Sequence, residues 1–367
     1  MQFTVEATAL NAALKKISPA IQRVTSLPIL EYVLCVVKDN VLSIKGTNLR
    51  ITINISIPCQ STDQLEVVLP FKKLLNITST LSAPITIICD KKANTIKYGR
   101  GKYELGVPVD AKDFPKSQPI KAGFQFLADS NFLEKMHLSK SFVSTAETET
   151  FFCDVLIRVK EGVINLCASD RLHIIHYHQP TDFKGNKSFL FSTDFINAIS
   201  GFQSGNIVAD EKQIMFTSED ESFTAISLLN EIEYPDVLKV VSSLQGEPKN
   251  VVFDRKEMLQ SINQIMVFDE PFYVAEFNLG KQNKIDIKWK SLTTNESVEI
   301  SLDAEHKTDC QSIGFNAKKL KDCISALAGS ESLSLSISTA VRPVCIYGDD
   351  ENTVVIITPV VMSNEQK

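Results

Sequence analysis

A unit of one strand followed by one helix recurs six times along this chain of 367 residues, and this repetition restricts the fold more than any other feature. Three copies begin at residues 3–6, 124–127 and 251–254, which lie about 120 residues apart. Another copy follows each of them about 60 residues later, at residues 67–70, 189–192 and 312–315. The alternative is three unrelated α+β domains, but such domains would not share the half-repeat.

Each half-repeat is expected to hold one strand, one helix and three further strands. Apolar residues spaced three and four apart predict helices over residues 7–17, 71–81, 130–141, 193–202, 255–265 and 316–327. Helix starts are indicated by Pro70, by Ser192 or Thr193, and by Asn316. Strands are predicted over residues 31–37, 41–45, 50–57, 154–159, 163–168, 173–178, 274–279, 285–289, 297–302, 333–337, 344–347 and 353–358.

Polar segments with Gly or Pro at residues 119–123 and 246–250 indicate the domain boundaries. The expected domains are residues 1–121, 122–247 and 248–367. The fold class is α+β, with three copies of one domain, and the repetition allows sheets on one side and helices on the other.

Composition excludes several classes of protein. With 44% hydrophobic and 22% charged residues, the chain is neither disordered nor of low complexity. No stretch approaches 18 apolar residues, and the N-terminus has no basic region followed by an apolar core, so we expect neither a membrane span nor a secretory signal. Eight scattered cysteines without a CxxC motif favour reduced, buried thiols in a cytoplasmic protein over disulfides or zinc ligands.

Positive charge is concentrated on the predicted helices. The six helical segments carry a net +7, and because the whole chain is −6, the remaining segments hold −13. Helices that face a common interior would make it basic, and such a surface attracts a phosphate backbone without reading bases. The alternative is that lysines simply favour helices and keep their ammonium groups in solvent. Aromatic platforms for single strands are not evident, which favours duplex DNA.

Seven short motifs occur in order along the chain: Met1-Gln2-Phe3-Thr4-Val5, Leu27-Pro28-Ile29-Leu30, Gly46-Thr47-Asn48-Leu49, Asp113-Phe114-Pro115, Ala168-Ser169-Asp170, Tyr234-Pro235-Asp236 and Pro359. Through them the sequence resembles the bacterial β sliding clamps, the processivity rings of replicative DNA polymerase. This resemblance covers nearly the full length. It implies three clamp domains in each chain and a head-to-tail dimer that forms a ring, with helices around a central hole and sheets outside.

The resemblance also implies a function and its partners. A closed ring slides on duplex DNA through weak, nonspecific contacts, and it tethers the polymerase III catalytic subunit and the clamp loader through short apolar peptides. The implied DNA-binding residues are Lys15, Lys16, Arg23, Lys72, Lys73, Lys135, Lys140, Lys318, Lys319 and Lys321. The implied dimer residues are Tyr103, Leu105, Met266 and Val267, for which ordinary core packing is the alternative.

Family clamps hold partner peptides in an apolar pocket between the second and third domains. The matching residues here are Cys153, Ser169, Arg171, Leu172, His173, Ile174, Pro235, Lys239, Val240, Ile356, Thr358 and Val360. The sequence departs from the family at this pocket, because Arg171 replaces a glycine, and Leu172 and His173 replace a His-Arg pair. The peptide preference is therefore expected to differ. The acidic residues Glu147 and Glu149 are unexpected in a loop of a DNA-facing region.

An enzyme is the main alternative, because Cys167, Asp170, His173, His176 and His178 crowd one segment. On a strand, His176 and His178 would share a face while His173 points the other way. No second cluster with metal-ligand spacing, no Gly-rich phosphate loop, no GxSxG and no HExxH is present. We therefore expect no catalytic residue, metal or cofactor. A second alternative is a non-replicative clamp-like scaffold with altered partner specificity.

Overall fold

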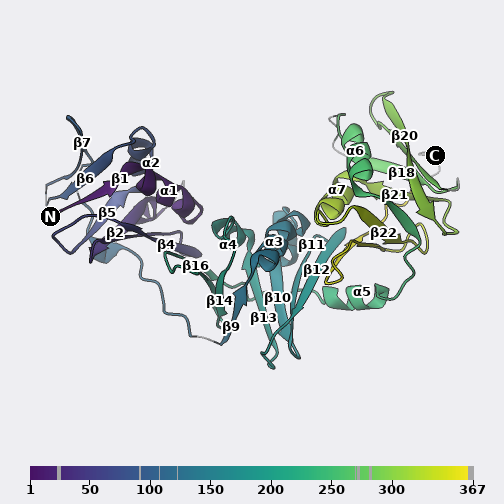
Figure 1. The fold of residues 1–367 in the computed structure, drawn as a ribbon, viewed down its shortest axis with the longest axis horizontal. Coiled ribbons are helices and arrows are strands. Elements are labelled where there is room, and N and C mark those ends of the chain that lie inside the picture. The colour runs from purple at the N-terminus through teal and green to yellow at the C-terminus, as the bar shows by residue number, and fades with distance from the viewer. Residues whose placement is uncertain are drawn as a thin grey trace. The chain divides into compact units, whose positions relative to one another are not determined.

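The computed structural model describes residues 1–22, 26–90, 92–106, 108–121, 123–268, 270, 273–280 and 283–362. Within these residues the chain divides into two compact units (Figure 1). One unit contains Met1–Leu133 and Phe191–Asn230, and the other contains Glu134–Leu190 and Glu231–Lys367. Among the described helices, none is long and apolar enough to cross a membrane.

The first unit contains an eight-stranded sheet in the order β5-β2-β3-β4-β16-β15-β14-β9 and a four-stranded sheet in the order β1-β6-β7-β8. Its strands are β1 (Gln2–Glu6), β2 (Tyr32–Lys38), β3 (Val41–Thr47), β4 (Ile51–Pro58), β5 (Leu65–Pro70), β6 (Pro84–Cys89), β7 (Asn94–Tyr98), β8 (Gly101–Glu104), β9 (Phe124–Ala128), β14 (Gly205–Ala209), β15 (Gln213–Ser218) and β16 (Phe223–Leu228). Its helices are α1 (Ala7–Ile17), α2 (Phe71–Ser79) and α4 (Thr193–Ala198).

The second unit contains a twelve-stranded sheet in the order β13-β10-β11-β12-β24-β23-β22-β17-β20-β19-β18-β21. Its strands are β10 (Asp154–Lys160), β11 (Val163–Ser169), β12 (His173–Pro180), β17 (Val251–Asp254), β18 (Val274–Asn278), β19 (Lys284–Lys290), β20 (Ser297–His306), β21 (Ser312–Asn316), β22 (Ser332–Ser336), β23 (Val344–Tyr347) and β24 (Thr353–Ile357). Its helices are α5 (Val237–Leu244), α6 (Arg255–Ile265) and α7 (Ala317–Ser325). The chain passes between the units three times: within α3 (Ser130–Ser139), within β13 (Lys187–Ser192), and after β16 between Asn230 and Glu231.

The six predicted half-repeats are confirmed, because the order strand, helix, three strands recurs from β1 to β24. The helices form because one face of each is apolar: α1 buries Leu10, Leu14 and Ile17 against the strands. The buried amide of Asn11 on α1 donates hydrogen bonds to the Leu75 carbonyl (3.2 Å) and the Thr78 hydroxyl (3.0 Å) of α2. This holds α1 and α2 side by side (Figure 1).

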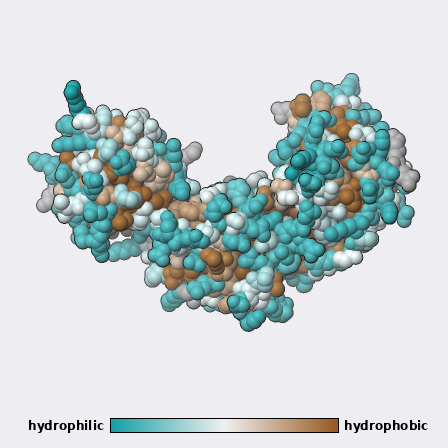
Figure 2. All heavy atoms as spheres, viewed as in Figure 1, coloured by the Kyte–Doolittle hydropathy of each residue, from teal (hydrophilic) through white to brown (hydrophobic). Residues whose placement is uncertain are grey.

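Hydrophobic residues are mostly enclosed within each unit. On the face shown in Figure 2, each unit presents a largely hydrophilic surface with separate hydrophobic areas. The eight cysteines are all free thiols, and five of them are buried, which agrees with the expectation of reduced, buried cysteines.

The half-repeats meet in the same way in both units. In the first unit, β4 ends the first half-repeat of the chain and pairs antiparallel with β16, which ends the second half-repeat of the middle third. In the second unit, β12 ends the first half-repeat of the middle third and pairs antiparallel with β24, which ends the last half-repeat. One kind of strand pairing therefore joins successive thirds of the chain.

Several predicted boundaries were wrong in detail. Three helices end earlier than predicted, at Ser79, Ala198 and Ser325. The helix that begins at Ser130 ends at Ser139 and is followed by a 3-10 turn over Lys140–Phe142. One helix, α5, was not predicted at all. The three domain boundaries stay predictions, because the two compact units divide the middle third between them.

Candidate functional site

Four exposed lysines lie on α1 and α2, in the first unit. Lys15 and Lys16 lie in the last turn of α1, where a cation also stabilises the helix dipole. Lys72 and Lys73 lie in the first turn of α2, where the helix dipole disfavours a cation and favours a bound anion. Helix stability therefore does not explain why lysines occupy positions 72 and 73.

Lys16 is partly fixed by its surroundings. Its ammonium lies 4.5 Å from the centroid of the Phe202 ring, which is a cation–π contact within the first unit. The side chain stays exposed, so the charge remains available to a phosphate group.

The other predicted DNA-binding cations lie in different environments. Lys135 is buried and ion-paired with Asp350 at 3.2 Å, and Lys319 is ion-paired with Asp170 at 2.6 Å. Burial lowers the pKa of the Lys140 ammonium. Lys318 is exposed and Lys321 is half-buried, while Arg23 lies outside the described residues. The charges of Lys135 and Lys319 are thus already neutralised by carboxylates within the second unit.

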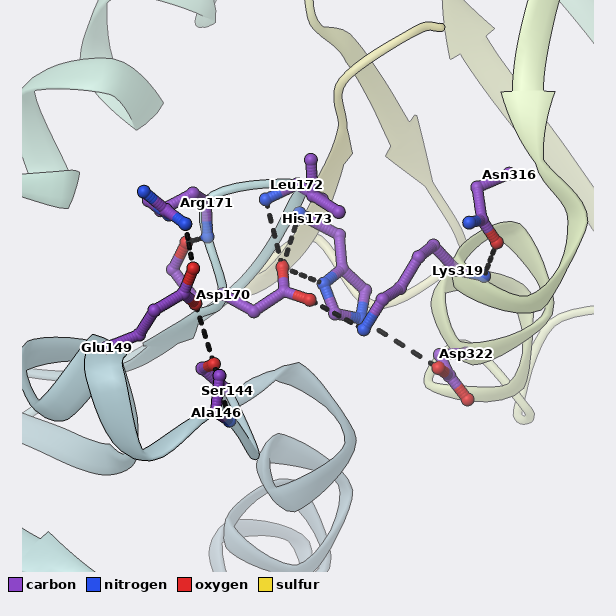
Figure 3. Close-up of polar contacts among 11 residues, drawn as sticks. Ser144, Ala146, Glu149, Asp170, Arg171, Leu172, His173, Asn316, Lys319 and Asp322 are labelled. Atoms are coloured by element: carbon purple, nitrogen blue, oxygen red, sulfur yellow. Dashed lines mark hydrogen bonds and ion pairs between the residues drawn. The ribbon is translucent and has the colours of Figure 1, made fainter. Parts of the chain in front are cut away.

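A tight turn over residues 169–172 connects β11 to β12 in the second unit (Figure 3). The Asp170 carboxylate accepts hydrogen bonds from the amides of Leu172 (2.9 Å) and His173 (3.0 Å) and from Nδ1 of His173 (2.6 Å). The Leu172 carbonyl in turn accepts a hydrogen bond from the Thr358 amide at 2.8 Å. Both backbone polar groups of Leu172 are therefore held.

Asp170 is the centre of a mostly buried charge cluster. Burial alone would raise its pKa, but hydrogen bonds and the charge of His173, together with the bond from Lys319, hold the pKa well below its usual range. The Nε2 atom of His173 lies 3.9 Å from the Asp322 carboxylate on α7, and the His173 ring stacks on Phe142 at 4.3 Å. Burial raises the pKa of the Asp322 carboxyl.

Arg171 adopts a left-handed backbone conformation, with φ of 76°. Its amide donates to the Ser169 hydroxyl at 3.0 Å, and its guanidinium forms an ion pair with Glu149 (Figure 3). Glu149 also accepts a hydrogen bond from the Ser144 hydroxyl at 2.7 Å. Glu149 therefore fixes the side chain of the residue that replaces the family glycine, and this explains an acidic residue in that loop.

An apolar surface adjoins this turn. Helix α5 packs Val237, Val241 and Leu244 onto Ile174 and Ile356, which are opposite each other on β12 and β24. Leu172, Pro235 and Val240 each lie within two residues of a member of this cluster; Leu172 and Val240 are 49% and 40% exposed, and Pro235 is exposed. We call the exposed side chains Leu172, Pro235 and Val240 the partner surface.

The remaining predicted pocket residues surround or support this region. Ser169 and His173 are buried in the turn, and Cys153 ends the 3-10 stretch Glu147–Phe152. Lys239 is exposed and ion-paired with Asp236 at 3.4 Å. The half-buried residues Thr358 and Val360 lie on the segment after β24, where the Val360 amide donates to the Gly314 carbonyl at 2.8 Å. A Cβ on Gly314 would lie 2.6 Å from the Val360 carbonyl oxygen, so glycine permits this approach.

The four predicted dimer residues differ in accessibility. Tyr103 lies on β8, is 36% exposed and stacks on Tyr98 at 5.1 Å. Leu105 is buried in its own unit, and its amide donates to the Asn94 carbonyl. Met266 and Val267 follow α6, and Val267 is 78% exposed.

The histidine-rich segment does not form a metal site in the part of the chain that the structure describes, because no three His, Cys, Asp or Glu side chains there are arranged so that they could hold a metal ion. The Nε2 atom of His176 lies 2.9 Å from the Asn165 side-chain oxygen, and its ring stacks on His178 at 5.6 Å. Burial, together with the neighbouring His178, lowers the pKa of His176 to about 4. Burial raises the pKa of the Cys167 thiol to about 12, which makes it a poor nucleophile.

Comparison with known proteins gives a consistent result. Residues 1–118 match the family described as DNA polymerase III beta subunit, N-terminal domain. Relatives named beta sliding clamp include those of Pseudomonas putida, 22% identical over 97% of this chain and 99% of that relative, and of Bacillus subtilis, 23% identical over 98% and 99%.

Solved structures show the same fold. A sliding clamp from Pseudomonas aeruginosa, described as DNA polymerase III subunit beta bound to griselimycin, matches with a TM-score of 0.89 and 21% identity over 99% of this chain and 100% of that one. The Bacillus subtilis sliding clamp matches with a TM-score of 0.87 and 21% identity over the same shares. The resemblance found in the sequence is confirmed.

Proposed function

We propose that this chain, which is similar to bacterial β sliding clamps over nearly its full length, acts as a sliding clamp for a replicative DNA polymerase. Two copies join head to tail around duplex DNA, with the helices facing the DNA and the sheets outside. The ring holds the polymerase by a topological link, which raises the local concentration of primer ends without any catalytic residue in the clamp. The relatives are named beta sliding clamp and the matching family is described as DNA polymerase III beta subunit, so the comparisons do not favour a non-replicative scaffold.

The repeated strand pairing is the observation that carries the ring proposal. In each third of the chain, one strand ends the first half-repeat, as β4 does, and one strand ends the second half-repeat, as β16 does. Two of the three possible pairings between such strands occur within the chain, as β4–β16 and β12–β24. The two strands that lack such a pairing within the chain are β20 and β8. Among the described residues, β8 pairs with β7, and β20 pairs with β19 at residues 297–303 and with β17 at residues 304–306.

Pairing β20 of one copy with β8 of another would remove both open sheet edges. Because each copy offers one β8 and one β20, the contact is head to tail, and two such contacts close a ring of two chains. This is the homodimer that the resemblance implied.

The internal repeat also predicts the register of this contact. Ile53 on β4 lies opposite Ala225 on β16. The hairpin registers make Val298 on β20 the counterpart of Ile53, and Tyr103 on β8 the counterpart of Ala225. Tyr103 of one copy is therefore expected opposite Val298 of the other.

The same register sets Lys102 opposite Glu299. Opposite charges on directly facing residues stabilise a strand pair, so this contact favours the proposed register over a slip by one residue. Val267, exposed after α6, adds apolar area of the kind that a dimer buries.

The DNA contact is proposed for the exposed helix lysines Lys15, Lys16, Lys72, Lys73 and Lys318. Ammonium groups on flexible side chains neutralise phosphates without reading bases, which is compatible with sliding. Since Lys135 and Lys319 are already paired with carboxylates, we leave them out of the DNA surface.

The partner surface is proposed to hold an extended apolar peptide of the polymerase III catalytic subunit or the clamp loader. Leu172, Pro235 and Val240 offer exposed apolar contacts on a rigid support of two strands and α5. Burial of each large apolar anchor of the peptide contributes roughly 1.5–3 kcal/mol.

The test of the whole proposal is topological. The protein is loaded by a clamp loader onto nicked circular DNA, and half of the sample is then linearised. A sliding clamp stays on the circle and leaves the linear molecule from its ends, whereas an ordinary DNA-binding protein stays on both.

A further inference from the structure

The chain contains an internal control for the turn at residues 169–172. The equivalent turn in the first unit, at residues 47–50, has the same hydrogen bonds: the Asn48 side-chain oxygen accepts from the amides of Arg50 (3.0 Å) and Ile51 (2.8 Å). Leu49 has φ of 73°, close to the 76° of Arg171. The carbonyl of Arg50 accepts from the Leu228 amide at 2.8 Å, as the Leu172 carbonyl does from Thr358.

The two turns differ in the side chain that holds the backbone. Asn48 holds its turn with a neutral amide, whereas Asp170 makes the same two backbone hydrogen bonds with a carboxylate. The negative charge of Asp170 is therefore not required to form the turn. It costs free energy, because the Asp170 side chain is only 7% exposed, and a partner must offset that cost.

That partner is Lys319, in the first turn of α7. Its ammonium lies 2.6 Å from the second oxygen of Asp170, and its side chain is 23% exposed. Its own amide is held by the Asn316 side chain at 3.2 Å (Figure 3). The neighbouring Lys318 is exposed instead, so α7 directs one lysine to solvent and the next into the second unit.

The pair reaches the partner surface through Leu172. One oxygen of Asp170 binds Lys319, and the other binds the amides of Leu172 and His173. His173 adds a second link, because it lies between Asp170 (2.6 Å) and Asp322 on α7 (3.9 Å). The position of the exposed Leu172 side chain thus depends on contacts to α7.

We propose that Lys319 is a positioning residue for the partner surface rather than a DNA-binding residue: through Asp170 it anchors the turn that presents Leu172 to α7. This inference rests on the proposed function and assigns Lys319 to partner binding. A polymerase segment binds with less loss of conformational freedom when the turn is already held in one arrangement.

The experiment measures two properties of the full-length protein. Binding of the purified polymerase III catalytic subunit reports the partner surface, and affinity for a short duplex over a range of salt concentrations reports the DNA surface. The variants are K319M and D170N, with K319R as the conservative replacement and K318M as the matched control one residue away.

K319M is expected to weaken polymerase binding about tenfold, the equivalent of one well-placed hydrogen bond, and to leave the salt dependence of duplex affinity unchanged. D170N is expected to weaken polymerase binding similarly while the turn persists, as Asn48 shows that it can. K319R is expected to recover most of the affinity. K318M is expected to do the reverse of K319M: it should weaken duplex binding and leave polymerase binding unchanged.

Two outcomes would overturn the assignment: K319M binds polymerase like the wild type, or K319M weakens duplex binding as K318M does. The double variant D170N/K319M removes both charges and leaves no unpaired buried charge. If it melts at the wild-type temperature but binds polymerase weakly, the loss of binding comes from the lost link and not from misfolding. Failure of the proposed function itself is visible in the wild type, which would then show no polymerase binding or no preference for circular DNA.

Discussion

The guanidinium of Arg171 is ion-paired with the carboxylate of Glu149, and this contact ties the tight turn beside the partner surface to the 3-10 stretch before β10. The backbone is unusual at this point, since Arg171 has φ of 76°, where glycine is the unstrained residue. Leu49, in the equivalent turn of the first unit, has φ of 73° with an apolar side chain, so the backbone does not need an ion pair here, and Glu149 serves to fix the guanidinium.

Substitution of Arg171 should separate strain from side-chain contact. R171G loses an exposed ion pair but relieves the left-handed conformation, so its free energy of unfolding should stay within about 0.5 kcal/mol of the wild type. R171A loses the ion pair and keeps the strain, so it should be about 1 kcal/mol less stable than R171G. Urea unfolding measures both, and equal stability of the two variants would contradict the assigned strain.

The proposed dimer register predicts a charge-reversal experiment. K102E and E299K should each weaken the dimer, because the reversed residue meets a like charge on the other copy. The double variant restores opposite charges across the contact but loses the pairs of Lys102 with Glu104 and of Glu299 with Lys288, so it should recover part of the loss. Sedimentation over a range of concentrations gives the dimer constant. Equal weakening in the double variant, with no recovery, would show that these two residues do not face each other.

The helix lysines predict a change in salt dependence. Replacing Lys15, Lys16, Lys72 and Lys73 with glutamine should reduce the slope of log affinity against log salt by up to about 3–4, since each phosphate contact contributes about 0.9. Fluorescence anisotropy with a short duplex measures that slope.

A control with the same charge change uses the exposed residues Lys38, Lys92, Lys112 and Lys116 of the same unit. If this control variant flattened the salt dependence as much as the helix variant does, net charge rather than the helix surface would account for the effect.

His176 predicts a loss of stability at mildly acidic pH. Its pKa is lowered to about 4 by burial and by His178, whereas an unfolded histidine titrates near 6.5. The unfolded state therefore binds more protons between these values, so stability is complete above about pH 6.5 and declines as the pH falls toward 4.

This decline should amount to about 2 kcal/mol at pH 5. Protonation of Asp170 lowers the stability only at more acidic pH, because its pKa lies below the ordinary aspartate range. The variant H176L should lose most of the decline between pH 7 and 5. Urea unfolding at both pH values tests this, and an unchanged decline in H176L would assign it to other groups.

The partner surface predicts a selective defect. L172D places a charge among the exposed apolar side chains and should weaken polymerase binding at least tenfold, because an apolar contact worth roughly 1.5–3 kcal/mol is lost. L127D is a matched control, since Leu127 is also exposed but lies on β9 of the first unit. Polymerase-stimulation assays compare the two, and normal stimulation by L172D would show that the peptide docks elsewhere.

Much of the fold was predictable because periodicity reports local structure. The bounds of α1 and α6 agree with the apolar spacing, since their buried faces are regular. Helix α5 was missed because it lies between half-repeats, where the repeat indicates no element. Its apolar residues Val237, Val241 and Leu244 stabilise a helix only when the sheet beneath them is present.

The candidate site was predictable in outline but not by residue. Lys318 and Lys319 are adjacent and look equivalent in the sequence, yet one is exposed and the other is paired with Asp170. Which lysine of a helix points inward depends on the partner that the fold brings to it. The ion pair between Glu149 and Arg171 was hidden for the same reason, because these residues are far apart in sequence.

The most direct test of a sliding clamp is its retention on DNA of two topologies. Loaded protein should persist on nicked circular DNA for many minutes and leave the same DNA within seconds after linearisation, because only an end releases a closed ring. Equal retention on circular and linear molecules would contradict the account.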